Sequence, residues 1–139
     1  MRNTFVYSKH KIHTWKGIEG KVLVESLNIE AVFISWLGER IECPVVADTP
    51  SPCPPAFVSV ERVGGGRDNV SVDYPELSIL CWATSRFEAA QLAYEVDAQL
   101  ADFAHEPRIA KIKRSMLRNH PDETDNKARY QILVDITTA

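Results

Sequence analysis

The segment LSILCWATSRFEAAQLAYEVDAQLADF, residues 77–103, places a strand directly before a helix and so decides the kind of fold. Residues 77–83 are mostly apolar, which is typical of a buried strand. Ser85 and Glu88 then form a capping box, in which a hydroxyl and a carboxylate satisfy the free backbone amides at a helix start. The helix that follows has a single apolar face made of Ala89, Leu92, Ala93, Val96, Leu100 and Phe103.

A second helix is predicted upstream of this segment. Asn28 is a suitable N-cap, and Glu30 in the first turn suits the positive end of the helix dipole. The helix is expected to stop at Cys43-Pro44, because proline cannot continue it. Its apolar positions recur at helical spacing: Ile29, Val32, Phe33, Trp36, Leu37 and Ile41.

Further strands are predicted on both sides of the helix over residues 85–103. Residues 56–63 are rich in β-branched side chains, and residues 70–74 can pair back as a short strand. Residues 109–117 have the pattern of a half-exposed strand. The final strand alternates without interruption, with one face made of Tyr130, Ile132, Val134 and Ile136.

Prolines and glycines mark the connections. Residues 44–55 contain five prolines, which predicts a surface connector or a sheet edge and excludes a central strand. Gly64–Gly66, followed by Arg67-Asp68-Asn69, predicts a turn, because glycine readily adopts positive φ. Residues 119–127 are polar and predict a loop.

The order of elements is therefore helix, three strands, helix, two strands. This order predicts an α+β domain over residues 28–139, with a mostly antiparallel sheet and both helices on one face. Residues 1–27 are predicted to be an extended N-terminal arm. Residues 1–28 contain five basic and two acidic residues, a charge of +3, so the rest of the chain has a charge of −6. Such an arm can be solvated or can reach an acidic surface on a neighbouring molecule.

Length and composition narrow the class of protein. The chain has 139 residues, enough for one core without disulfides or a metal. A net charge of −3 argues against a protein that mainly wraps nucleic acid. Three widely spaced cysteines cannot all pair with one another, which favours a reducing cytoplasm. No apolar run approaches the ~20 residues of a membrane span, and no signal peptide is recognisable, so no membrane association is expected.

No arrangement of residues points clearly to catalysis, and we expect no enzyme activity, no cofactor and no metal. Gly64–Gly66 lacks the Lys-Ser/Thr of a phosphate-binding loop. His10 and His13 can face one metal only with further ligands that the sequence does not fix. A metal-dependent nuclease is an alternative, and its acidic residues would be drawn from Glu61, Asp68, Asp73 and Glu76.

The strand at 109–117 and its flanks are strongly basic. One interpretation is nucleic-acid binding through phosphate contacts, although no RNA-binding motif accompanies these residues. A second is an edge strand that its charges protect from aggregation. A third, which we prefer, pairs this strip with an acidic loop, Asp122-Glu123-Asp125, of an adjacent subunit. The basic residues are Arg108, Lys111, Lys113, Arg114 and Arg118.

The succession of segments resembles one known family. A helix leads through Ile-Glu-Cys-Pro-Val-Val (41–46) and the prolines to PAFVSVERVGGG (55–66). DYPEL (73–77), CWA (81–83) and SRFEAA (85–90) follow, and ARYQI (128–132) opens the last strand. This series, over about residues 28–138, resembles the tail-terminator, or tail-completion, proteins of long-tailed bacteriophages and prophages, particularly those of actinobacterial hosts.

The resemblance implies a structural virion protein that is made in the host cytoplasm and located in the phage tail. Such a subunit forms a closed ring, usually of six copies, that caps the tail-tube protein, ends its polymerisation and presents the surface for the head-completion or connector protein. DNA only passes through the lumen. A head–tail connector or minor tail protein is the alternative within virions, and a nucleic-acid-binding α+β module is the alternative outside them. Expected subunit contacts are Arg67 and Asp68 at the glycine turn, the basic strip and the acidic loop.

Overall fold

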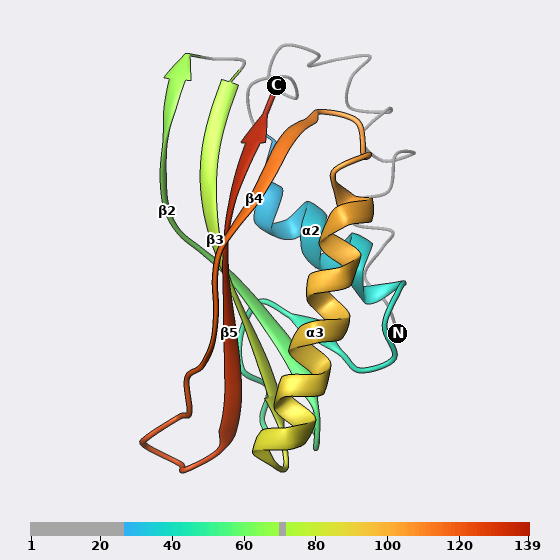
Figure 1. Cartoon of the computed structure of the whole chain (residues 1–139), viewed down its shortest axis with the longest axis vertical. Coiled ribbons are helices and arrows are strands. Elements are labelled where there is room, and N and C mark those ends of the chain that lie inside the picture. Colours follow the sequence, from blue (N-terminus) through green and yellow to red (C-terminus); the bar gives the residue numbers. More distant parts are fainter. Residues whose placement is uncertain (1–26, 70–71) are drawn as a thin grey trace.

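The computed structural model describes residues 27–69 and 72–139, with the backbone alone for residues 67–69. The predicted arm at 1–27 and the histidines at 10 and 13 therefore lie outside the described residues, except for Leu27. The elements, labelled as in Figure 1, are α2 (Ile29–Gly38), β1 (Val45–Val46), β2 (Phe57–Asn69), β3 (Val72–Ala83), α3 (Arg86–Phe103), β4 (Ile109–Asn119) and β5 (Ala128–Thr138).

The predicted α+β class is confirmed. The five strands form one sheet in the order β1-β2-β3-β5-β4. The β1–β2 pair is parallel and every other pair is antiparallel. Both helices lie on the same face of the sheet, where α3 crosses β3, β5 and β4 and α2 lies over β1 and β2 (Figure 1). We call this the covered face and the opposite one the open face.

The core lies between the helices and the covered face. Its centre is aromatic: Phe33 of α2 meets Phe103 of α3 edge-to-face, with ring centroids 5.0 Å apart, and Trp36 packs 4.9 Å from Phe103. Alternate strand residues point into this layer, because side chains change face at every position along a strand. The buried strand residues here are Val58, Val60, Leu77, Ile79, Cys81, Ile109, Ile132, Val134 and Ile136.

The helix starts follow their sequence signals. The Asn28 side chain accepts a hydrogen bond from the Ala31 amide at 3.1 Å, and the Ser85 hydroxyl accepts one from the Glu88 amide at 3.2 Å. Both predicted N-caps are therefore confirmed. The Glu88 carboxylate accepts a hydrogen bond from the Thr84 hydroxyl, one residue before the cap. Helix α2 ends at Gly38, earlier than expected, and a turn around Leu37 then leads toward β1.

The predicted turn at Gly64–Gly66 is wrong. Strand β2 continues through the glycines to Asn69, with a register irregularity between Arg62 and Gly64. Gly65 has φ +98° and pairs with Pro75 of β3, where a Cβ would lie 1.9 Å from the Tyr74 carbonyl oxygen. The glycines therefore serve a distorted strand rather than its end. The hairpin connection falls at residues 70–71, outside the described residues.

The strands expected separately at 70–74 and 77–83 are one strand, β3. Pro75 lies between the two expected strands and removes a backbone N–H from the middle of the sheet. Its place opposite Gly65, where β2 is irregular, lets the strand continue. The proline-rich connector contributes β1, a two-residue edge strand, in agreement with the expected edge position.

Candidate functional site

The two edges of the sheet differ in how much of their length is already paired with a neighbouring strand. At one edge, β1 pairs with β2 only at Val58 and Ser59. Three residues beyond Ser59, the Glu30 carboxylate accepts a hydrogen bond from the Arg62 amide at 2.7 Å. Beyond that point residues 63–69 have no neighbouring strand on their outer side among the described residues. At the other edge, β4 is the outermost strand along its whole length. The sheet therefore has two edges where another strand can pair.

Strand alternation divides the predicted basic strip between the two faces. Lys111, Lys113 and Arg118 pair with Thr137, Asp135 and Gln131 of β5, which lie on the open face. Arg114 pairs with Val134 and lies on the covered face, where its Nε donates to the Asp97 carboxylate of α3 at 2.8 Å. Only three of the five basic residues therefore share the exposed open face.

Arg108 lies at a corner and holds the end of the chain. It has φ +72°, its Nε donates to the Ala139 carbonyl oxygen at 3.0 Å, and its own carbonyl accepts from the Ala139 amide at 3.0 Å. This arginine has a structural role within the chain that the sequence did not indicate.

The acidic loop lies at the tip of the β4–β5 hairpin, at the opposite end of the molecule from the tip of the β2–β3 hairpin (Figure 1). The Asp122 side chain accepts a hydrogen bond from the Thr124 amide at 3.1 Å, and the Asp122 backbone forms an isolated antiparallel β-bridge with Lys127. Glu123 and Asp125 are exposed. Arg67 and Asp68 lie in the last part of β2, with the Arg67 backbone opposite Asp73, and their side chains are not described.

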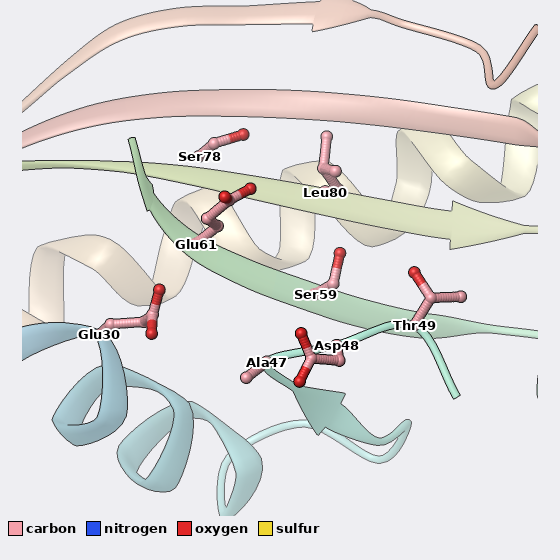
Figure 2. A pocket seen from close by; sticks show the side chains of 8 residues that line it. All are labelled: Glu30, Ala47, Asp48, Thr49, Ser59, Glu61, Ser78 and Leu80. Carbon is pink, nitrogen blue, oxygen red and sulfur yellow. The ribbon is translucent and has the colours of Figure 1, made fainter. Parts of the chain in front are cut away.

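A pocket that the sequence did not reveal lies on the β2 edge (Figure 2). Its volume is about 440 Å³. Four segments build it: the first turn of α2, the connector after β1, and the open-face positions of β2 and β3. No local pattern could have found it, because strand pairing brings these segments together. We call it the acidic pocket, and its lining is Glu30, Ala47, Asp48, Thr49, Ser59, Glu61, Ser78 and Leu80.

The floor of the acidic pocket is fixed by hydrogen bonds. The buried Ser59 hydroxyl accepts from the Trp82 indole N–H at 3.1 Å, and the buried Ser78 hydroxyl accepts from the Gln131 side-chain amide at 2.9 Å. Three carboxylates, Glu30, Asp48 and Glu61, stand around this floor (Figure 2). The pocket therefore presents negative charge above rigidly held hydroxyls, a setting that favours a cationic group.

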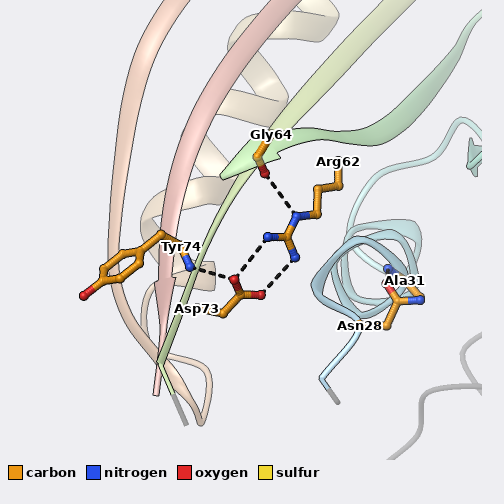
Figure 3. A network of polar contacts seen from close by, with 6 residues as sticks. All are labelled: Asn28, Ala31, Arg62, Gly64, Asp73 and Tyr74. Carbon is orange, nitrogen blue, oxygen red and sulfur yellow. Dashed lines mark hydrogen bonds and ion pairs between the residues drawn. The ribbon is translucent and has the colours of Figure 1, made fainter. Parts of the chain in front are cut away.

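An ion pair stabilises the β2–β3 hairpin next to this pocket (Figure 3). The Arg62 guanidinium contacts both oxygens of Asp73 at 2.9 and 3.1 Å and also donates to the Gly64 carbonyl oxygen. Asp73 in turn accepts from the Tyr74 amide.

Asp73 lies on the covered face, whereas Glu61 and Glu76 lie on the open face. These three described members of the suggested nuclease set do not converge.

In the part of the chain that the structure describes, three side chains have shifted pKa values. Burial raises the pKa of the Cys81 thiol well above its usual range, which keeps it protonated in the core. Partial burial, and then the positive charges of Arg129 and Arg118, lower the pKa of His120. A hydrogen bond with Cys53 raises the pKa of Lys127. Among the described residues, no group of three or more His, Cys, Asp or Glu side chains is placed to hold a metal ion.

In the described part of the chain, no helix has the length and apolar character to cross a membrane. Comparison of the sequence with models of known protein families and with curated proteins gave no match.

Proposed function

We propose that this chain is a structural subunit that assembles head-to-tail into a closed ring, and that the ring terminates a phage tail tube. The sheet geometry supports the first half of the proposal. The resemblance of residues 28–138 to tail-terminator proteins is the basis of the second half, including the tail-tube and head-completion partners.

The direction of the two edge strands is the observation on which the ring rests. β2 is antiparallel to β3, β3 to β5, and β5 to β4, so β4 runs opposite to β2. A copy rotated about an axis roughly along the strands keeps their direction. The free part of its β2, residues 63–69, then meets the first copy's β4 as an antiparallel neighbour, and the sheet continues from subunit to subunit.

The charges at the two edges support the same arrangement. Lys111, Lys113 and Arg118 make the open face basic along β4. The opposite edge holds Glu61 together with the other carboxylates of the acidic pocket. Unlike edges attract one another, whereas two copies of the same edge repel, and this favours a heterologous contact that closes into a ring over an isologous dimer. Arg114, engaged with Asp97 in its own chain, is a weaker candidate for a subunit contact than the sequence suggested.

The ring is tested by measuring the mass of the full chain as a function of concentration, by sedimentation velocity, together with negative-stain images. We expect closed rings of uniform size whose fraction rises with concentration. A protein that stays monomeric at about 1 mM, the limit of a weak specific contact, would overturn the proposal. Binding to tail-tube subunits rather than to portal-side proteins distinguishes a tail terminator from a head–tail connector.

Nucleic-acid binding is the second candidate, because three exposed basic side chains share the open face. Phosphate contacts of this kind weaken steeply as salt is added. Retention of duplex DNA that falls steeply between 50 and 200 mM salt, and that is lost in a Lys111→Glu/Lys113→Glu variant, would favour this candidate over the ring.

A further inference from the structure

The acidic pocket and Arg118 lie at the same height on opposite edges of the sheet. Ser59 of the pocket pairs with Leu80, Leu80 with Gln131, and Gln131 with Arg118. This row crosses the open face from β2 to β4. In a ring whose subunits are related by rotation about an axis along the strands, residues of one row come to the same height at every junction. Arg118 is then the basic residue of β4 nearest to the neighbouring copy's pocket.

Both groups keep binding capacity within their own chain. The Nε of Arg118 donates to the Gln131 side-chain oxygen at 3.0 Å, while its two terminal nitrogens meet no acceptor among the described residues. Asp48 and Glu61 form no ion pair with a described residue. The pocket therefore has two carboxylates to offer, and the opposite edge has a guanidinium with its donor fork unused.

We propose that the acidic pocket is the binding site for the Arg118 guanidinium of a second copy, an inference that rests on the proposed ring. The planar guanidinium donates paired hydrogen bonds to a carboxylate, and Glu61 and Asp48 are on hand to receive them. The long side chain reaches past β1, which is only two residues long at this point. The cavity exceeds the size of one guanidinium, and the remaining space admits bridging water.

The inference assigns the pocket a role in register. Backbone pairing between β4 and the free part of a neighbouring β2, residues 63–69, can slip along the strand, because successive positions there offer similar amides and carbonyls. A single guanidinium held in one pocket selects one register, and every junction in the ring then adopts the same one. Loss of the contact should therefore weaken association and also broaden the distribution of ring sizes.

A charge swap in the full-length protein tests the contact. Glu61→Arg and Arg118→Glu are each expected to weaken subunit association about tenfold or more, because each places like charges at the junction. The double variant restores the opposite pairing and is expected to recover most of the loss. Arg86→Glu, an equal charge change at an exposed position on α3, is the matched control and should leave association unchanged.

The outcomes separate this inference from the proposed ring. If the wild-type chain forms rings and both single variants do so equally well, the pocket contact is wrong and the ring stands. If the wild-type chain forms no rings, the proposed function fails first. A different occupant of the pocket is also recognisable. If the double variant does not recover association, and if deletion of the net-basic residues 1–26 weakens association as much as Glu61→Arg does, the N-terminal arm occupies the pocket. The inference is then overturned. Thermal unfolding of each variant confirms that it is folded.

Discussion

The two faces of the sheet are built from the same strands but meet different surroundings. On the covered face Val134 and Ile136 are almost wholly buried beneath the helices. Their neighbours along β5, Leu133 and Asp135, point to the open face and remain at least partly exposed. One face is therefore completed within the subunit, while the other keeps accessible charge and apolar surface that a second molecule can cover.

The open face is not uniformly solvated, however. At the start of β2, Phe57 stacks on Trp82 with ring centroids 5.1 Å apart, and Arg129 lies 4.8 Å from the centre of the Trp82 ring. Both aromatic rings are buried. The open face thus combines packed aromatic rings at the start of β2 with exposed charged side chains along β4.

The largest loss of stability is expected when an aromatic ring is removed from the centre of the core, on the covered face. Phe103→Ala deletes a fully buried ring that contacts Phe33 and Trp36, and we expect it to lower the free energy of unfolding by about 3–5 kcal/mol. Met116→Ala, on the open face and 38% exposed, should cost less than about 0.5 kcal/mol. Urea unfolding of both variants gives the comparison, and similar losses would mean that the open face is packed as tightly as the covered one.

The next effect concerns the distorted part of β2, beyond the helices. Gly65→Ala places a methyl group 1.9 Å from a backbone oxygen at a positive φ and should cost roughly 2 kcal/mol or more. Gly66→Ala meets no atom within 4 Å and should be neutral or stabilising by less than about 1 kcal/mol. Thermal unfolding distinguishes the two variants. Equal destabilisation would show that β2 does not follow the described path here.

A smaller loss of stability is expected when the ion pair between Arg62 and Asp73, on the covered face, is broken. Asp73→Asn leaves Arg62 without its charged partner and should cost about 1–2 kcal/mol, a value that allows for the 36% exposure of the arginine side chain. Asp102→Asn breaks the exposed pair with Arg40 and should cost less than about 0.5 kcal/mol. If chemical denaturation finds the two losses alike, Asp73 is far more solvated than its position indicates.

The smallest effect is expected at His120, which lies between the end of β4 and the acidic loop. Because the pKa of His120 is lowered in the folded protein, the unfolded chain binds this proton more readily. Stability is then complete above the unfolded pKa of about 6.5 and decreases as the pH falls below it. His120→Gln should show a smaller loss between pH 7.5 and 5 than the wild-type chain, with His105→Gln as control. An unchanged pH profile in His120→Gln would contradict the prediction.

Local signals predicted much of the fold. The caps at Asn28 and Ser85, the apolar stripe of α3 and the alternation in β5 each depend on neighbours in sequence, and each is confirmed. The glycine turn failed because glycine permits both a turn and a distorted strand, and pairing with Pro75 decides between them.

The candidate site was less accessible to the same reasoning. The basic residues of β4 were found as a run, but strand alternation turns Arg114 away from its neighbours and toward Asp97. The acidic pocket joins residues 30, 48, 61 and 78, which only the sheet brings together. Sequence patterns therefore identified the types of residue involved, while their grouping into surfaces depends on long-range pairing.

The number of long strands has a consequence of its own. β2, β3, β5 and β4 are four, and an even count leaves the outer two running in opposite directions. With three or five such strands the outer two would run the same way. Antiparallel pairing between neighbouring subunits would then require every second subunit to be inverted, so the two sides of the assembly would be identical. Parity therefore permits a polar assembly with two distinguishable ends from a single polypeptide.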